Sequence, residues 1–276
     1  MKLVITIPAF NEEKRIPIFL SEILDFVIKN GDVEVIIVDD GSRDKTIEIA
    51  QKYGCKIIYH ENVGFADPAR NFAISQAAND WILVVDSDEV IPRELLDYLR
   101  EEIQKPDCPN IFFIPRKNIL SGKVLWSWYP DSIIRFFKKG SLSFSSKVHC
   151  MPKILQGPTY RIDSKRTELA ILHYNYDSIE AFIGRMNKYT TLELEKLTQR
   201  GKKFSIHFII FRSLAEFIKK YFLKQGYKDG THGFIYAVLM AYYKFVAIAK
   251  LWEYENRQIQ IEDNKQILAE VNEQVS

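Results

Sequence analysis

Three apolar segments in the first third of the chain alternate with segments of helical periodicity. The apolar segments cover residues 2–7, 33–38 and 81–85 and are rich in Val and Ile. Between the first two, apolar residues recur at helical spacing at Ile16, Phe19, Leu20, Ile23, Leu24 and Val27. Buried strands separated by helices are typical of βαβ units, so the pattern predicts an α/β fold with a mostly parallel sheet and flanking helices.

The alternation continues to about residue 115. We expect further helices at about residues 44–52, 68–78 and 93–104, and further strands at 56–59 and 111–114. Residues 117–170 are irregular and rich in aromatic residues, which suits either a β-rich layer or a surface on which sugars stack.

Helical spacing returns at Ser178 and continues into the C-terminal third. We therefore expect a Rossmann-like half at 1–115, a second half of the same domain at 116–170, a C-terminal helical appendage at 171–255 and a polar tail at 256–276.

Polar side chains follow each of the three strands. Asn11 and Glu12 follow the first strand, Asp40 follows the second, and Asp86 and Asp88 follow the third. Because the carboxyl ends of parallel strands meet at one edge of a sheet, we expect these groups to lie close together. Carboxylates at this edge suit a divalent cation that holds a diphosphate, although each motif alone also fits a turn or a helix cap.

The order of four motifs carries a resemblance to a known family. The motifs are Pro8-x-x-Asn11-Glu12, Val38-Asp39-Asp40-Gly41-Ser42, Asn62-x-Gly64 with Arg70-Asn71, and Asp86-x-Asp88-Glu89. They resemble the nucleotide-sugar half of family 2 glycosyltransferases with the GT-A fold. A weaker match through Trp128 to Asp131, Arg135 to Lys139 and Val148-His149 is similar to the branch of lipopolysaccharide core β-glucosyltransferases.

The resemblance implies a metal-dependent, inverting transfer of a hexose from a uridine diphosphate sugar (UDP-sugar) to a hydroxyl of a lipid-linked or cell-envelope glycan. The residues that it places at the base and ribose are Pro8, Phe10, Glu12 and Asp40. Arg70 is expected at the base or phosphate, and Arg135 at the diphosphate or an acidic acceptor. Without the resemblance, Arg70 is an exposed helix arginine.

The resemblance also implies a Mg²⁺ or Mn²⁺ ion that stabilises the negative charge of the leaving nucleoside diphosphate. Asp88 is the expected metal ligand, and Asp86 is expected to contact the ribose or to support the ligand.

An inverting transfer needs a general base for the acceptor hydroxyl. Family members often use an acidic pair beyond the Asp-x-Asp motif, and this chain has no obvious Glu-Asp pair there. Asp131 is the best carboxylate available, unless it only pairs with Arg135, and His149 is the second candidate. The related branch usually has Glu after that histidine, whereas Cys150 stands here, so no acidic role is transferred to this position.

Composition limits the other classes of function. A chain of 276 residues, 47% of them hydrophobic, can bury a sizeable core, and its net charge of +2 with no basic-aromatic motif makes nucleic acid an unexpected partner. The three cysteines, Cys55, Cys108 and Cys150, are widely spaced and indicate a reducing compartment. Met1 leads directly into a strand rather than a signal peptide, so we expect cytoplasmic residence.

The C-terminal third is locally basic. Residues 200–250 contain ten Lys or Arg and two acidic residues, with apolar residues at roughly helical spacing. Basic amphipathic helices bind anionic membrane surfaces, so we expect residues 200–252 to hold the protein peripherally on the inner face of the cell membrane. The residues expected to face headgroups are Lys219, Lys220 and Lys224, and those expected to face acyl chains or protein are Phe211, Ile218 and Phe222.

Alternatives remain open from the sequence. The apolar stretch 233–252 also fits packing within the protein, a homo-oligomer interface, or a membrane span interrupted by Lys244 and Lys250. A nucleotidyltransferase shares the chemistry of the sheet edge, although the Gly-rich phosphate loop that it needs does not follow the first strand. A non-catalytic nucleotide-sugar or glycan-binding protein would keep the binding residues without a base.

Overall fold

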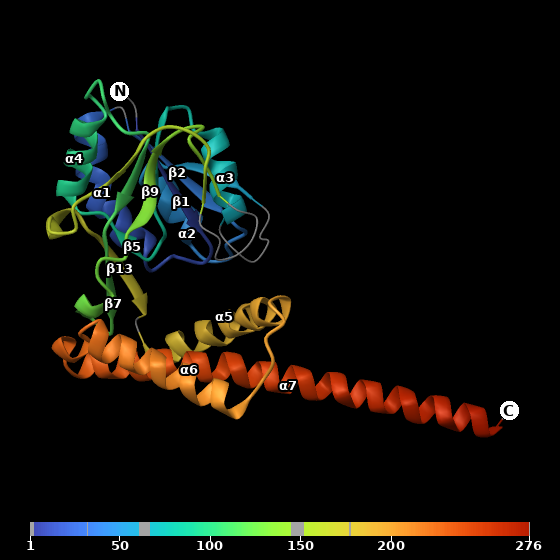
Figure 1. The fold of residues 1–276 in the computed structure, drawn as a ribbon. Helices are drawn as coiled ribbons and strands as arrows, with labels where there is room; N and C mark the ends of the chain where they lie inside the picture. Colours follow the sequence, from blue (N-terminus) through green and yellow to red (C-terminus); the bar gives the residue numbers. More distant parts are fainter. Residues whose placement is uncertain (1–2, 32, 61–66, 145–151, 177, 276) are drawn as a thin grey trace. The chain divides into compact units, whose positions relative to one another are not determined.

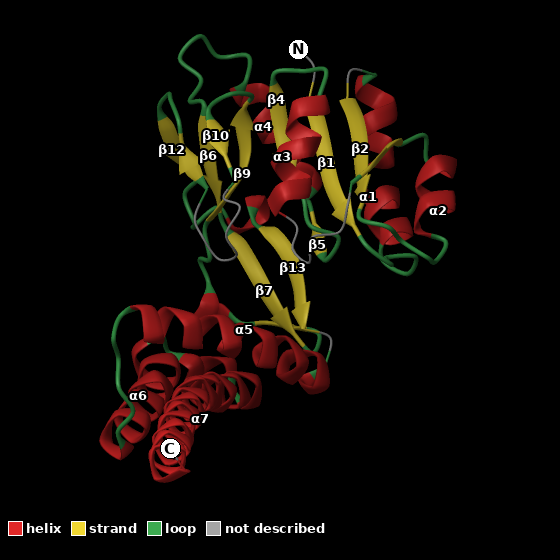
Figure 2. Cartoon of the chain, turned by 90° about the vertical axis from the view of Figure 1, so that its right-hand side faces the viewer, coloured by secondary structure: helices red, strands yellow, loops and turns green. Residues whose placement is uncertain are grey.

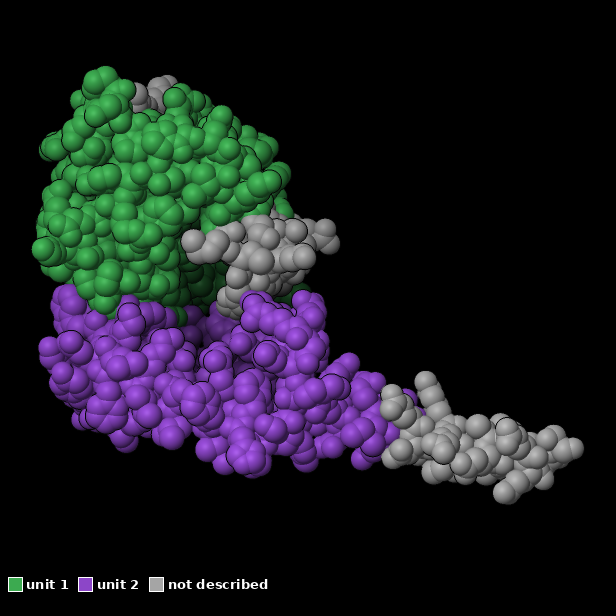
Figure 3. Space-filling model, viewed as in Figure 1, with its two compact units in different colours: residues 1–119, 129–175 green, residues 120–128, 176–276 purple. Residues whose placement is uncertain are grey.

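The structure, a computed structural model, describes residues 3–31, 33–60, 67–144, 152–176 and 178–275 (Figure 1). The chain divides into two compact units (Figure 3). The first unit comprises residues 1–119 and 129–175, and the second comprises residues 120–128 and 176–276.

The first unit is built on a seven-stranded sheet with the order β12-β6-β9-β4-β1-β2-β3. Its strands are β1 (Leu3–Ala9), β2 (Val33–Asp39), β3 (Lys56–Tyr59), β4 (Trp81–Val84), β6 (Ile111–Ile114), β9 (Ile133–Lys138) and β12 (Thr159–Arg161). Strand β1 pairs in parallel with β2 and β4, and β2 pairs in parallel with β3. Strand β9 is antiparallel to both of its neighbours. The prediction of an α/β fold with a mostly parallel sheet is confirmed.

The four helices of the first unit lie where periodicity predicts them. They are α1 (Ile16–Asn30), α2 (Thr46–Lys52), α3 (Asp67–Gln76) and α4 (Arg93–Glu102). Helix α1 has proline in its first turn and ends at Gly31, whose N–H donates to the carbonyl of Val27. Gly31 has φ of 59°, a left-handed conformation that glycine adopts without strain.

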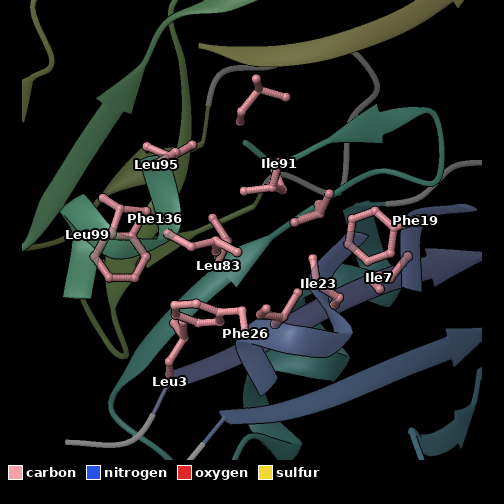
Figure 4. Close-up of a cluster of buried hydrophobic side chains, with 14 of the residues drawn as sticks. Leu3, Ile7, Phe19, Ile23, Phe26, Leu83, Ile91, Leu95, Leu99 and Phe136 are labelled. Atoms are coloured by element: carbon pink, nitrogen blue, oxygen red, sulfur yellow. The ribbon is translucent and has the colours of Figure 1, made fainter. Parts of the chain in front are cut away.

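Alternating residues of the central strands pack on opposite faces of the sheet. On one face Leu3 and Ile7 of β1 pack against Phe19 and Phe26 of α1, and α4 covers the same cluster (Figure 4). On the other face Val4 of β1 packs with residues of α3. Figure 2 shows α1 and α3 on opposite sides of the sheet. Burial of each large apolar side chain contributes about 1.5–3 kcal/mol, and this packing fixes the strand ends that carry the polar loops.

Short elements complete the first unit. They are β5 (Glu89–Val90), β7 (Arg116–Leu120), β10 (Leu142–Ser143), β11 (Lys153–Ile154), η2 (Thr167–Leu169) and β13 (Ile171–Tyr176). The last residue of β7 and the last residue of β13 belong to the second unit. Strand β13 lies between β5 and β7 in a smaller sheet, and β10 pairs with β11. The aromatic segment therefore contributes a series of short strands, and this layering brings β5, β7 and β13 together beside the Asp-x-Asp loop.

The second unit is mostly helical. Its elements are β8 (Lys123–Val124), η1 (Trp126–Trp128), α5 (Ile179–Gln199), α6 (Ile206–Ile218), the π-helical turn η3 (Lys219–Leu223), η4 (Gly226–Asp229) and α7 (Thr231–Val275). The hydroxyl of Ser178 caps α5 by accepting from the N–H of Ala181, and Ser205 caps α6 in the same way from Phe208. Helices α6 and α7 lie side by side (Figures 1 and 2).

Helix α7 continues through Val275, so the residues expected to form a polar tail are helical in the structure. A polar run without apolar periodicity gives no sign of a packed helix, which is why composition alone suggested a tail.

Residues 120–128 belong to the second unit rather than to the half-domain expected at 116–170. Leu125 is buried in a cluster with Phe182 and Tyr236. The carboxylate of Asp229, itself buried, accepts from the backbone N–H groups of Trp126 (3.1 Å) and Ser127 (2.8 Å). These contacts join residues more than 100 positions apart, which a local pattern does not reveal.

Candidate active site

The loops after β1 and β2 are joined by hydrogen bonds. The N–H of Asn11 donates to the hydroxyl of Ser42 (3.0 Å), and the side-chain oxygen of Asn11 accepts from the N–H of Arg43 (2.8 Å). Asn11 has φ of 57°, which asparagine tolerates better than most residues. The buried carboxylate of Asp39 accepts from the N–H groups of Gly41 and Ser42, so it holds the turn that precedes α2.

The residues expected at the base and ribose differ in their exposure. Pro8 is buried within β1, opposite Val38, whereas the ring of Phe10 is 48% exposed. The carboxylate of Asp40 lies 3.3 Å from Nδ1 of His60. Burial raises the pKa of Asp40, and the hydrogen bond with His60 offsets part of that increase. The ring of Phe10 is therefore open at this edge, the carboxylate of Asp40 is mostly covered beside His60, and Pro8 belongs to the core.

Glu12 connects the first loop to the Asp-x-Asp loop. The hydroxyl of Ser87 donates to Oε1 of Glu12 (2.8 Å), and the N–H of Glu12 donates to the hydroxyl of Thr46 (2.7 Å). Burial raises the pKa of Glu12 above its ordinary value. The strand ends of β1, β2 and β4 thus meet at one edge, as their parallel order requires.

Asp86 lies between two arginines. One carboxylate oxygen accepts from Arg70, near the start of α3, and the other accepts from Arg135 on β9. Burial raises the pKa of Asp86, but Arg135 and Arg70 outweigh that effect and hold the pKa well below its usual range. Arg135 also donates to Oε1 of the buried Glu89 (2.8 Å). Both arginines therefore contact the Asp-x-Asp loop.

Asp131 pairs with Arg116 and not with Arg135. Arg116, on β7, donates to Oδ2 of Asp131 (2.6 Å) and to Oε1 of Glu89 (3.0 Å). Oδ2 of Asp131 also accepts from Nδ2 of Asn118 (3.0 Å). Burial raises the pKa of Asp131, but Arg116 outweighs it and the net pKa is lowered. The alternative of an Asp131–Arg135 pair is wrong, because Arg135 is engaged by Asp86 and Glu89.

His173 on β13 links Asp131 to Asp88. Nδ1 of His173 lies 2.7 Å from Oδ1 of Asn118, and Nε2 lies 3.5 Å from Oδ1 of Asp88. Since Nδ2 of Asn118 donates to Asp131, its oxygen faces the histidine and accepts from Nδ1–H. This hydrogen bond assigns the unprotonated nitrogen of a neutral His173 to Nε2, on the side of Asp88.

These contacts run in series from Asp86 to Asp88, and the backbone of the Asp-x-Asp loop joins the two ends. We call this group the ion-pair ring. Its members are Asp86, Asp88, Glu89, Arg116, Asn118, Asp131, Arg135 and His173. The ring brings the expected metal ligand and the expected general base into one network.

Arg116, Asn118 and His173 were not predicted as site residues from the sequence. No local signal in the sequence pointed to His173, because His173 and Asn175 alternate with Leu172 and Tyr174, a pattern that favours the exposed face for the polar residues. The structure instead buries residues 171, 173 and 175 of β13. His173 and Asn175 thus lie on the buried face of β13, where polar side chains require hydrogen-bond partners.

Asp88 and His173 can serve as ligands for a divalent cation. A carboxylate oxygen and an imidazole nitrogen are both common metal ligands, and both oxygens of Asp86 are already occupied by arginines. Within the described ranges, no group of three or more His, Cys, Asp or Glu gathers into a metal site. The two side chains fit an ion whose remaining ligands come from a bound diphosphate and water.

A pocket of about 500 Å³ borders the ring at Asp131. Its lining residues are Pro130, Asp131, Ser132, Arg161, Ile162, Asp163 and Ser164. The guanidinium of Arg161 lies over the ring of Phe113, 4.5 Å from its centroid. Two carboxylates, a cation and hydroxyl-bearing residues thus line a space large enough for a sugar.

Several residues named from the sequence fall outside the described ranges. They are Asn62, Gly64, Val148, His149 and Cys150. The role of His149 as an alternative base therefore stays a prediction.

Comparisons with known proteins agree with the motifs. The family model described as Glycosyl transferase family 2 matches residues 4–153. An uncharacterized glycosyltransferase of Rickettsia typhi is 28% identical over 270 residues, which cover 88% of this chain and 84% of that protein. The lipopolysaccharide core biosynthesis glycosyltransferase LpsC of Rhizobium meliloti is 27% identical over 234 residues, which cover 80% of this chain and 83% of LpsC.

Among solved structures, residues 1–349 of S. aureus TarS superpose with a TM-score of 0.50 at 19% identity. The match covers 94% of this chain and 92% of that one. The predicted GT-A fold is thereby confirmed, as is the resemblance that the motifs carry.

Proposed function

The chain belongs to glycosyltransferase family 2, and from this membership we propose that it transfers a hexose from a UDP-sugar to a hydroxyl group of a lipid-linked or cell-envelope glycan. The transfer inverts the anomeric carbon. The observation that carries the proposal is the ion-pair ring, which connects a carboxylate–imidazole pair to a second carboxylate that lines a pocket.

The donor is assigned to the edge formed by the loops after β1 and β2. The exposed ring of Phe10 would stack on the base, and the carboxylate of Asp40 would accept from a base N–H, which uracil provides. Arg70 holds Asp86 in place at the same edge. This arrangement favours uridine over a base that presents only acceptors to Asp40.

Asp88 and His173 would hold the Mg²⁺ or Mn²⁺ ion. When bound, the ion supplies positive charge to the leaving diphosphate. Asn118 accepts from Nδ1 of His173 and so turns Nε2 toward Asp88, and Asp131 orients Asn118. Asn118 and Asp131 would therefore support the metal ligand His173, and through it the ion that binds the donor.

Asp131 is the proposed general base. The acceptor hydroxyl oxygen bonds to the anomeric carbon, the bond from that carbon to the diphosphate breaks with its electron pair, and the hydroxyl proton passes to Asp131. Three donor atoms bind Oδ2, so Oδ1 is the oxygen that takes the proton. Arg116 keeps Asp131 ionised, which ensures that the base form is present but lowers its basicity.

The acceptor is assigned to the pocket beside Asp131. Arg161 would bind an acidic group on the acceptor, and the similarity to LpsC supports a glycan of the cell envelope. Such glycans are built on membrane lipids, so an enzyme that receives UDP-sugars in the cytoplasm would meet its acceptor at the inner face of the cell membrane.

A donor panel tests the proposal without knowledge of the acceptor. Uridine, guanosine and cytidine diphosphate sugars are added with and without Mn²⁺, and the melting temperature is followed. We expect the largest increase with a UDP-sugar plus Mn²⁺, and loss of the uridine preference in Asp40→Ala. Asp131→Asn is the matched control, because it should keep the donor-induced increase.

The products separate the competing classes of function. Slow release of uridine diphosphate and free sugar indicates a glycosyltransferase, whereas release of a sugar phosphate and uridine monophosphate indicates cleavage within the diphosphate. Formation of a UDP-sugar from uridine triphosphate and a sugar phosphate would identify a nucleotidyltransferase. Stabilisation by the donor with no product, even when envelope glycans are added, would favour a binding protein.

A further inference from the structure

We propose that one face of the second unit, formed by α6 and α7, docks onto an anionic lipid bilayer with both helices parallel to the membrane plane. The proposal concerns a surface that the donor and acceptor sites do not use, so it stands or falls independently of the assigned reaction.

Two rows of exposed apolar side chains form this surface. On α6 the row is Ile206, Ile210, Phe211, Leu214 and Ile218. On α7 it is Phe234, Ile235, Val238, Tyr242 and Phe245. Successive members are mostly three or four residues apart, so each row keeps to one side of its helix.

The two rows flank the same seam between the helices. The ring of Phe234 contacts Phe217, at a centroid distance of 6.1 Å, and Tyr221, at 5.8 Å. Phe234 belongs to the α7 row, and Phe217 lies next to Ile218 of the α6 row. The rows therefore form one apolar surface, which we call the α6–α7 face. Exposed apolar surface of this extent is typical of an interaction site.

The charges around the α6–α7 face favour a negatively charged partner. Lys202 and Lys203 precede α6, and Lys224 and Lys228 follow η3, and all four are exposed. Residues 200–250 contain two acidic residues. The carboxylate of Glu216 lies 3.8 Å from the ammonium of Lys219, and Asp229 is buried. A second copy of the chain would bring the same positive charges together, whereas anionic headgroups neutralise them.

Lys220 has a different role from the one expected for it. Its ammonium lies 3.2 Å from the hydroxyl of Tyr236 and 5.8 Å from the ring centroid of Trp128. Lys220 of η3 thus packs against Tyr236 and Trp128 of the same unit. The exposed lysines are therefore the ones that would contact lipid headgroups.

The contacts of α7 argue against a membrane span. Thr231–Ile261 is long and apolar enough to cross a bilayer by length and composition. However, Nζ of Lys250 donates to the carbonyl of Asn187 (2.8 Å), and Nζ of Lys244 lies 3.4 Å from a carboxylate oxygen of Glu193. A span would break these bonds to α5 and place both lysines in hydrocarbon. Docking in the membrane plane keeps them and buries only the exposed side.

Vesicle binding by the full chain tests the proposal. We expect the protein to sediment with vesicles of phosphatidylglycerol and phosphatidylcholine, to bind vesicles of phosphatidylcholine alone more weakly, and to be released by salt. The double substitution Phe211→Ser and Leu214→Ser should lower the partition coefficient about tenfold or more. Ile28→Ser on α1 is the matched control, because Ile28 is 69% exposed and Phe211 is 70% exposed. The control should bind as the parent does.

A second pair of variants tests the charges. Lys224→Glu with Lys228→Glu should lower binding to anionic vesicles on the order of tenfold per lysine, while Lys29→Glu on α1 should leave it unchanged. Circular dichroism and melting temperature verify that each variant is folded.

Three results would overturn the proposal. The first is a folded parent protein that ignores anionic vesicles at low salt. The second is a concentration-dependent dimer that the Phe211→Ser, Leu214→Ser variant abolishes while vesicle binding is unaffected, which would identify a protein interface. The third is binding that resists both salt and alkali and protects the end of α7 from added protease, which would identify a span.

Discussion

The ion-pair ring and the α6–α7 face use basic residues in opposite ways. In the ring, Arg135 is buried and Arg116 is partly buried, with 15% of its side chain exposed, and each contacts two carboxylates. On the face, Lys224 and Lys228 are exposed among uncovered apolar side chains. A buried cation fixes the position of its carboxylates, because separation would leave a charge without compensation in a poorly polar environment. An exposed cation leaves its field available to an external partner.

Whether a basic side chain is buried beside carboxylates or exposed to solvent therefore decides if it fixes a site or attracts a partner. The first unit contributes a rigid arrangement of charges that organises a reaction, and the second contributes a surface whose charges remain available. Substitutions in the ring should therefore change turnover or folding strongly, whereas substitutions of exposed ion pairs in the second unit should change stability little.

The largest expected effect is on the base. Asp131→Asn removes the group that accepts the hydroxyl proton, so we expect turnover to fall by about 10² to 10⁴. Donor binding should be retained, because Asp40 and Phe10 are unchanged. Transfer assays and donor titrations on the same preparation measure both quantities. An active Asp131→Asn beside an inactive His149→Ala would move the base to His149.

The next effect concerns folding. Arg135→Gln leaves Asp86 and the buried Glu89 without their shared cation, so we expect the free energy of unfolding to fall by about 3–5 kcal/mol. Chemical denaturation measures the change. A loss below about 1 kcal/mol would mean that Arg70 and Arg116 alone compensate the two carboxylates, and the ring would not be the rigid unit described here.

Removal of a metal ligand should reduce turnover by roughly 10² or more in Asp88→Asn or His173→Ala. Because both residues are proposed to hold the same ion, the double variant should be hardly worse than either single variant. A chelator should inactivate the parent protein, and Mn²⁺ should restore it. Full activity of Asp88→Asn in the presence of chelator would exclude the metal role.

A smaller effect on activity is expected from Asn118, which contacts the proposed metal ligand His173. Asn118→Ala removes the acceptor that orients His173, so the Mn²⁺ concentration for half-maximal activity should rise about 10- to 100-fold. The maximal rate at saturating Mn²⁺ should fall much less. If only the maximal rate falls and the Mn²⁺ dependence is unchanged, Asn118 acts on Asp131 alone.

The smallest effect is expected on the free energy of unfolding, from an exposed ion pair in the second unit. Arg257 and Glu253 form an exposed ion pair on α7, and Arg257→Gln should change the free energy of unfolding by no more than about 0.5 kcal/mol. The same denaturation experiment serves Arg257→Gln and Arg135→Gln, so the two arginines provide a matched pair. Equal losses would contradict the contrast between buried and exposed cations.

The sequence was sufficient to predict the strands at 56–59 and 111–114 and the convergence of β1, β2 and β4 at one edge. Short runs rich in Ile and Phe between turn residues indicate strands, and parallel order follows from the intervening helices. Both signals are local, which is why they could be recognised from the sequence alone.

The ring was only half predictable. Asp88 and Asp131 stand out as carboxylates beside apolar or aromatic segments, but Arg116, Asn118 and His173 meet them through the pairing of β5, β7 and β13. The sequence offered Arg135 as a partner of Asp131, and only the fold brings Arg116 to that position. Strand pairing between distant segments depends on packing that no local period records.

The bond between Asp229 and the segment Trp126–Ser127 has a consequence during synthesis. Asp229 follows Ser127 by 102 residues, and at a translation rate of about 5–20 residues per second its carboxylate leaves the ribosome roughly 5–20 seconds later. Throughout that interval the two N–H groups lack the carboxylate of Asp229, and Leu125 lacks Tyr236, the last buried member of its apolar cluster. The nascent chain must therefore pass through a stage in which this segment is exposed to chaperones and proteases, however early the strands of the first unit assemble.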